Sequence, residues 1–271
     1  MDNLKKFDVE NSLISDELKE NLPDWWQSIN KEDYFLVMTD DLDSLFSCQR
    51  LKTLFGLEVG GFYSFEKGLY INDKISENGW KTPIFVDLSI GKNQYCFDNH
   101  RTFVKNENKV NPNVIHRDYS NKYNFSTLTL IAALYGGVDE MSDIQKELLI
   151  AVDGGFIGYY KNGGRWKDVN IYWLKQLGLA DYLIPILEEK SMKYFQELGV
   201  DYCLHDKIII NDDGYLEMEN GDVPDIKFEF KQGIEKCKMR KSDAELYHRT
   251  HSDILVSAET YKDNYILNLL V

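Results

Sequence analysis

A short apolar segment that ends in a cluster of aspartates constrains the fold of this chain more than any other feature. Residues 34–39, Tyr-Phe-Leu-Val-Met-Thr, are rich in aromatic and branched side chains and predict a buried β-strand. Asp40, Asp41 and Asp43 follow directly, and residues 45–55 have the apolar spacing of a helix. A strand, an acidic turn and a helix in this order are typical of an open α/β sheet, which binds ligands at the carboxyl ends of its strands.

The acidic turn has two interpretations from its residues alone. Clustered carboxylates repel one another, and a hard cation with oxygen ligands, such as Mg²⁺ or Mn²⁺, relieves that repulsion. The same turn also suits a solvated helix start, in which Asp43 or Ser44 caps the helix.

Other expected strands also end in polar residues. They cover residues 59–65, 84–89 and 94–97. The second contains Asp87 near its end, and the third is followed by Asp98, Asn99 and His100. Strands that alternate with helical patterns predict a parallel sheet with helices on both faces. These polar residues would then converge at one edge of the sheet.

The rest of the chain predicts further helices and a smaller second domain. Ser126 suits the N-cap of a helix that runs to Tyr135, and residues 66–82 read as a loop. Further helices are expected at 139–152 and 170–198, and late strands at 207–210, 227–230, 254–257 and 265–270. The predicted division is an N-terminal arm at 1–32, a parallel-sheet domain at 33–188 and a small α+β domain at 189–271.

Composition narrows the class of protein. A hydrophobic content of 43% supports a folded core, and the net charge of -14 argues against a broad basic track for long nucleic acid. The four cysteines form no CxxC pair, which indicates reduced thiols in a cytoplasmic protein and no structural zinc. No signal peptide and no membrane span are expected from the apolar runs. The oligomeric state stays open.

The order of these motifs resembles the DHH phosphoesterase superfamily. The matching residues are Asp41-Leu-Asp43-Ser44, Val86-Asp87, Asp98-Asn99-His100, Val110-Asn111-Pro112 and Val152-Asp153-Gly154. The usual motifs of the family are DxDG, a lone aspartate after a strand, Asp-His-His and a later aspartate. The family includes RecJ-like exonucleases, oligoribonucleases, cyclic dinucleotide phosphodiesterases, 3′-phosphoadenosine phosphate phosphatases and inorganic pyrophosphatases. The resemblance covers roughly residues 34–160.

The resemblance implies a centre of one or two Mn²⁺ or Mg²⁺ ions. Asp41 and Asp43 would each bind an ion, Asp87 would bridge the two ions, and Asp153 would complete the second. Two cations bridged by a carboxylate activate a water and neutralise oxygens during displacement at phosphorus.

The resemblance also implies residues around the ions. Asp98 and His100 would be catalytic, with Asp98 supporting the site and His100 facing metal or substrate phosphate. Asp40 and Asn99 are further candidate metal ligands. Arg101 and Arg165 are candidate contacts to substrate phosphate.

Three residues depart from the pattern of the family. Thr39 stands where relatives usually have His or Asp, Ser44 replaces the glycine of DxDG, and Asn99 replaces the first His of Asp-His-His. The leading hypothesis is a phosphoesterase that acts on a nucleotide, a cyclic dinucleotide or a short single-stranded oligonucleotide. The alternative is a catalytically degenerate domain that binds a nucleotide or a protein partner without turnover.

A third hypothesis is a haloacid dehalogenase-like phosphatase in which Asp41 is the nucleophile. Asp41 and Asp43 fit its DxD motif superficially, but Leu45 stands where Thr or Val is expected. The Asp98-Asn99-His100 segment has no role in that mechanism, which makes this hypothesis the weakest of the three.

Overall fold

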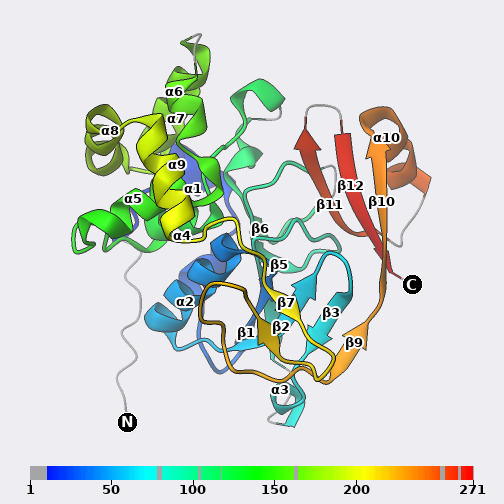
Figure 1. Ribbon diagram of the computed structural model, residues 1–271. Helices are drawn as coiled ribbons and strands as arrows, with labels where there is room; N and C mark the ends of the chain where they lie inside the picture. The colour runs from blue at the N-terminus through cyan, green and yellow to red at the C-terminus, as the bar shows by residue number, and fades with distance from the viewer. Residues whose placement is uncertain are drawn as a thin grey trace.

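A seven-stranded, mainly parallel sheet forms the centre of the chain (Figure 1). The computed structural model describes residues 11–77, 81–102, 105–116, 118–161, 164–250, 254–261 and 264–270. The parallel strands are β1 (Tyr34–Thr39), β2 (Val59–Ser64), β4 (Thr82–Val86), β5 (Tyr95–Phe97) and β6 (Lys109–Val110). Two antiparallel strands, β3 (Gly68–Ile71) and β9 (Phe230–Gln232), complete one side. The predicted α/β class is confirmed.

The strand order places a crevice at the end of β1. The order is β6-β5-β4-β1-β2-β3-β9, so the chain continues from β1 to β2 on one side and adds β4 on the other. Open α/β sheets bind ligands where the strand order reverses in this way, outside the carboxyl ends of the strands. Here that point lies between β1 and β4. Asp40, Asp41 and Asp43 follow β1, and Asp87 follows β4.

The two faces of the sheet are covered differently. Leu36 and Met38 of β1 pack into the large core with the helices, whereas Phe35 and Val37 face a second core. That second core includes Leu255 and Val256 of β11 (Ile254–Tyr261), and Ile75 of the short helix α3 (Lys74–Glu77) packs against it. Helices are expected on both faces of the sheet. On the second face β11 forms most of the cover, so this expectation is wrong in detail.

The helices follow from local capping signals. Ser126 caps α4 as predicted, and Gly136 ends this helix with a φ of 65°. The longer helices, most of which gather on one side of the sheet (Figure 1), are α2 (Leu42–Phe55), α4 (Thr127–Tyr135), α5 (Asp143–Ala151), α7 (Arg165–Gln176), α8 (Ala180–Glu189) and α9 (Met192–Asp201). The shorter ones are α1 (Asp16–Asn21), η2 (Asp24–Ser28), η3 (Pro112–Val114), η4 (Tyr119–Asn121), η5 (Val152–Gly154) and α6 (Ile157–Tyr160).

Three expected boundaries differ from the structure. The predicted loop at 66–82 contains β3 and α3. Helix α5 begins after Ser142, which forms a capping box with Gln145, and not at Asp139. The single helical region expected at 170–198 consists of α7, α8 and α9, because Gly178 adopts a φ of 64° and Ser191 starts a new helix.

The C-terminal region forms a small antiparallel sheet of order β10-β12-β11. Its elements are β10 (Ile234–Arg240), α10 (Lys241–Thr250), β11 and β12 (Asn264–Leu270), at the right of Figure 1. A hairpin turn joins β7 (Ile209–Ile210) to β8 (Leu216–Glu217), with Gly214 at a φ of 88°. The backbone N–H of Ser257 donates to the Ser89 carbonyl at 3.1 Å, which attaches β11 to the loop after β4.

The first described residues pack onto the main sheet. Trp26 is buried, and the indole N–H of Trp25 donates to the Asn108 carbonyl at 2.9 Å, so both anchor this segment. Residues 1–10 of the predicted arm lie outside the described residues.

Phe195 of α9 stacks on Phe156 at 5.3 Å between ring centroids. The division into three regions stays a prediction.

Two further expectations concern the whole chain. Among the described segments, no helix has the length and the apolar character that a membrane span requires. All four cysteines are free thiols, of which Cys48 and Cys96 are buried and Cys203 and Cys237 are half-buried.

Candidate active site

Asp41 begins helix α2 and fixes the turn after β1. Its carboxylate accepts a hydrogen bond from the Ser44 N–H at 3.1 Å, so the N-cap is Asp41 and not Asp43 or Ser44 as predicted. The Ser44 hydroxyl accepts from the Thr39 N–H at 2.8 Å and donates to the Val86 carbonyl at 2.9 Å. Ser44 therefore connects β1, α2 and β4.

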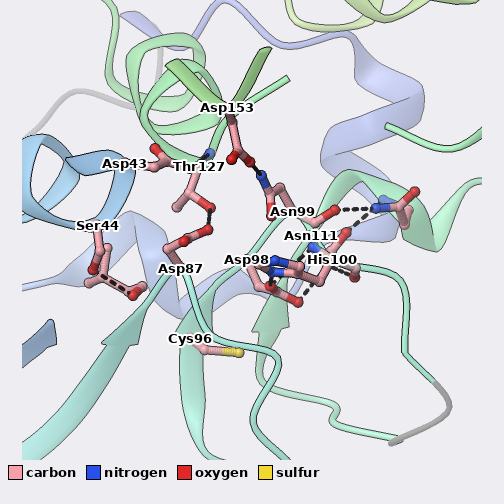
Figure 2. A network of polar contacts seen from close by, with 12 residues as sticks. Asp43, Ser44, Asp87, Cys96, Asp98, Asn99, His100, Asn111, Thr127 and Asp153 are labelled. Carbon is pink, nitrogen blue, oxygen red and sulfur yellow. Dashed lines mark hydrogen bonds and ion pairs between the residues drawn. The ribbon is translucent and has the colours of Figure 1, made fainter. Parts of the chain in front are cut away.

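Asp43 and Asp87 are held by the same residue, Thr127, at the start of α4 (Figure 2). Asp43 accepts from the N–H groups of Thr127 and Leu128 at 2.7 and 2.8 Å. The Thr127 hydroxyl donates to Asp87 at 2.8 Å. Both carboxylates are only 3% exposed. The start of a helix thus lies against two buried carboxylates, and its donors oppose the increase in pKa that burial causes.

Two candidate ligands have an unusual backbone. Asp87 and Asp153 adopt φ values of 60° and 61°, in the left-handed region that non-glycine residues rarely occupy. Aspartate tolerates this conformation better than most residues. Such strained positions cluster at functional sites, so their occurrence at two of the proposed ligands supports a functional role.

Asp98, His100 and Asn111 form a hydrogen-bonded group after β5. Asp98 contacts Nδ1 of His100 at 2.8 Å and accepts from the Asn111 amide, also at 2.8 Å. Burial acts to lower the pKa of His100, but Asp98 and the nearby Asp87 raise it to about 10. Burial acts to raise the pKa of Asp98, but the contacts with His100 outweigh it and hold the pKa below its usual value. We infer an ion pair.

Asn99 acts as a hydrogen-bond donor. Its amide nitrogen donates to the Asp153 carboxylate at 2.7 Å and to the Phe125 carbonyl at 3.2 Å. A flipped amide would place its oxygen against these two acceptors, so the assignment is fixed by the contacts. In this arrangement Asn99 places an N–H group, and not its carbonyl oxygen, toward Asp153, and Figure 2 shows the contact.

Asp40 forms an ion pair with a lysine that also lies near Asp41. The Lys207 ammonium lies 3.0 Å from an Asp40 oxygen and 3.6 Å from an Asp41 oxygen. Asp40 therefore belongs to an ion pair at the rim of the site.

The two candidate phosphate contacts have different surroundings. Arg101 forms an ion pair of 2.9 Å with Glu259, whose side chain is 1% exposed. Arg165 is the first residue of α7 and not part of an exposed loop, and it donates to the Ser120 hydroxyl at 2.6 Å. Arg101 lines the cleft beside the site, whereas the described lining of that cleft does not include Arg165.

The carboxylates interact electrostatically. Burial raises the pKa of Asp41, Asp43 and Asp87, and the charges of neighbouring carboxylates raise each of these values further. Asp153 contributes to all three shifts although it lies exposed at the mouth of the site. Asp41, Asp43, Asp87 and Asp153 are therefore coupled electrostatically, and their role as a common metal site stays a prediction.

The chemistry of this set fits a hard divalent cation. Carboxylate oxygens are the ligands that Mg²⁺ and Mn²⁺ prefer. Repulsion between the carboxylates favours their protonated forms, and a bound cation would take the place of those protons. Each of the four carboxylates is nevertheless in contact with a protein donor. Within the described ranges, no three Asp, Glu, His or Cys side chains converge on one ion position. An ion bound by three of these side chains would therefore require at least one of them to change its position.

A cleft of about 1240 Å³ opens beside the site, between the helices and the C-terminal sheet. Asn99, His100 and Asp153 lie in its wall. Its basic lining residues are Arg101, Lys122, Lys161, Lys238 and Arg240, and its aromatic ones include Tyr119, Tyr123, Trp166 and Tyr265. The net charge of the chain is negative, yet this cleft is lined by basic side chains next to acidic ones.

Sequence reasoning missed several residues of the site. Thr127 follows a recognisable helix cap, so its position was predictable but not its contacts with Asp43 and Asp87. Lys207 and Glu259 come from segments more than 50 residues beyond the last of the motifs and carry no local signal. Asn111 belongs to one of the motifs on which the resemblance rests, but no role was predicted for it.

Comparison of the chain with protein-family models, with curated proteins and with solved structures returns no match.

Proposed function

We propose that this chain is a metal-dependent phosphoesterase of the DHH type. Its substrate would be a nucleotide, a cyclic dinucleotide or a short single-stranded oligonucleotide. The observation that supports this best is the electrostatic coupling of Asp41, Asp43, Asp87 and Asp153 at the point where the strand order reverses, with Asp153 in the wall of a basic cleft.

The proposed roles follow from the contacts. Asp41, Asp43, Asp87 and Asp153 would hold one or two Mn²⁺ or Mg²⁺ ions. When bound, the ions supply a Lewis acid for phosphoryl oxygens and lower the pKa of an attacking water. Thr127 keeps Asp43 and Asp87 in place, so that neither has to reorient when substrate enters.

The chain itself supplies the groups that receive the phosphate. His100 is held through Nδ1 by Asp98, which leaves Nε2 to donate to a phosphoryl oxygen or a leaving oxygen. The basic residues of the cleft would bind further phosphates. Trp166 and Tyr119 in the cleft wall offer aromatic faces on which a base can stack.

The test is hydrolysis with a matched pair of variants. The full-length protein is incubated with Mn²⁺ and, in turn, a short oligonucleotide, a cyclic dinucleotide, 3′-phosphoadenosine phosphate and pyrophosphate. Asp87→Asn is the test variant, because Asn keeps the size and tolerates the φ of 60°. Asp212→Asn in an exposed turn is the control. We expect product from one substrate, a loss of more than about 100-fold in Asp87→Asn and none in Asp212→Asn.

A second candidate function is nucleotide binding without turnover. The contact between the Asn99 amide and Asp153 favours it, because a neutral protein donor occupies one side of a proposed ligand. Asn99→His restores the usual family residue and should produce hydrolysis if the domain is a dormant enzyme. Tight binding of a nucleotide without product, in both the original protein and Asn99→His, would favour the binding function.

A further inference from the structure

The segment that joins α9 to β7 carries a lysine to the rim of the candidate site. In Figure 1 this yellow segment runs from the helices toward β7. The N–H of Ile208 donates to the Asp40 carbonyl at 3.0 Å, and Lys67 donates to the Ile210 carbonyl at 2.7 Å. Ile208 and Ile210 are 2% and 1% exposed. The backbone on one side of Lys207 is therefore fixed by burial and by hydrogen bonds.

Lys207 contacts two successive aspartates with different roles. Its ammonium lies 3.0 Å from Asp40, which is not held with the other candidate ligands, and 3.6 Å from Asp41, which is. Burial acts to lower the pKa of Lys207, but the charges of Asp41 and Asp40 outweigh it and raise the pKa. The side chain stays positively charged at physiological pH.

We propose that Lys207 is a built-in cation that competes with a divalent metal ion for Asp41. This inference rests on the proposed function, because it concerns the metal ion of that same site. Asp40 anchors the ammonium close to Asp41, so an ion on Asp41 meets a positive charge a few ångströms away. Such a charge lowers the affinity for the ion and sets the metal concentration at which the site fills.

The competition follows from the geometry of the anchor. The link between Ile208 and the Asp40 carbonyl does not involve the ammonium, so the segment stays in place when an ion binds. Lys207 then keeps its contact with Asp40 and gives up only the longer contact with Asp41. The exposed fraction of its side chain, 60%, leaves room for this movement.

The test measures metal binding directly, without activity. The metal-free full-length protein is titrated with MnCl₂ by calorimetry, and free Mn²⁺ is followed by electron paramagnetic resonance. Lys207→Met removes the charge and Lys207→Arg keeps it. Lys193→Met is the control, because the Lys193 side chain is 81% exposed and forms an ion pair with Glu197 of the same helix. If Lys207→Met does not fold, as judged by circular dichroism, Lys207→Gln replaces it.

The expected result is specific to the loss of charge at Lys207. We expect the Kd for Mn²⁺ to fall roughly tenfold in Lys207→Met, and to stay unchanged in Lys207→Arg and Lys193→Met. Adding Asp41→Asn to Lys207→Met should abolish the gain. Binding that is detectable only in Lys207→Met would also support the proposal.

Two results would overturn the proposal. One is an equal Kd in the original protein and in Lys207→Met, and the other is no binding in either. Failure of the proposed function is a separate result, the absence of product that depends on Asp87. An unchanged Kd together with such product would reject only the role of Lys207.

Discussion

Asn99 donates a 2.7 Å hydrogen bond to Asp153 across the mouth of the candidate site, between residues 54 positions apart in the chain. The contact joins the segment after β5 to the end of α5. It places a neutral donor against a carboxylate that the resemblance assigns to metal binding. The consequences of this contact for stability and for metal binding can be separated by substitution.

Asn99→Leu tests whether this donor stabilises the metal-free protein. The variant keeps the approximate size but leaves the Phe125 carbonyl, which accepts a buried hydrogen bond from the Asn99 amide, without that donor, so we expect the free energy of unfolding to fall by about 1–3 kcal/mol. Urea unfolding in EDTA measures this change. Asn220→Leu is the control, because it removes a 2.8 Å amide contact to Asp206 on the exposed surface, and should change stability by less than about 0.5 kcal/mol. Equal effects of the two variants would contradict the prediction.

Thr127→Val tests the residue that holds two candidate ligands. The substitution keeps the shape of the side chain and removes the hydroxyl that donates to Asp87 at 2.8 Å. Asp87 is buried, so we expect a loss of about 1–3 kcal/mol in the free energy of unfolding. Thr127→Ser keeps the hydroxyl and should lose clearly less. If the valine variant unfolds at the same urea concentration as the original protein, the hydroxyl has no stabilising role.

The sequence predicts the parts of this site that depend on local order. A buried strand followed by Asp41 and Asp43 places these residues at the carboxyl edge of the sheet, and Asp87 follows by the same rule. Ser126 marks the start of α4 in the same local way. Such predictions succeed because strand ends and helix caps depend on residues a few positions apart.

Contacts between distant segments could not be predicted. Nothing near Lys207 indicates that its ammonium meets Asp40, because the contact depends on how α9 returns the chain to the sheet. The strand that covers the second face of the sheet is another example. Val256 has an ordinary strand pattern, and only the tertiary arrangement places it against β1. The hydrophobic pattern of a segment predicts which of its side chains are buried. It does not predict which other element covers them.

The pH dependence of stability should have one sign between pH 5.5 and 9. The pKa values of Asp41, Asp43 and Asp87 lie above their usual 3.8 in the folded chain, so folding retains protons and stability falls as pH rises. His100 acts in the same direction, because its pKa rises from 6.5 to about 10 and the protonated form contributes stability that is lost toward high pH.

Thermal unfolding in EDTA across this range measures the effect. We expect the Tm to decrease from pH 5.5 to 9. Saturating Mg²⁺ should reduce the slope, because the ion takes the place of the protons on the carboxylates. A Tm that rises with pH in EDTA would show that these carboxylates are not coupled as the structure indicates.

The ion pair between Arg101 and Glu259 should couple the C-terminal sheet to the candidate site. Glu259 belongs to β11, and Arg101 directly follows His100, with the two side chains 2.9 Å apart and largely buried. Breaking one partner of a buried pair costs about 3–5 kcal/mol, whereas removing both costs less than the sum.

A double-mutant cycle with Arg101→Leu and Glu259→Gln measures this coupling by urea unfolding. We expect an interaction energy above about 1 kcal/mol, because the second substitution removes the buried charge whose ion pair the first one has broken. The same cycle on Lys193 and Glu197, an exposed pair within α9, should give at most about 0.5 kcal/mol. Similar values for the two cycles would mean that Arg101 and Glu259 behave as an ordinary surface pair. Arg101 would then remain available for substrate phosphate, and the C-terminal sheet would have to reach the site through its backbone contacts alone.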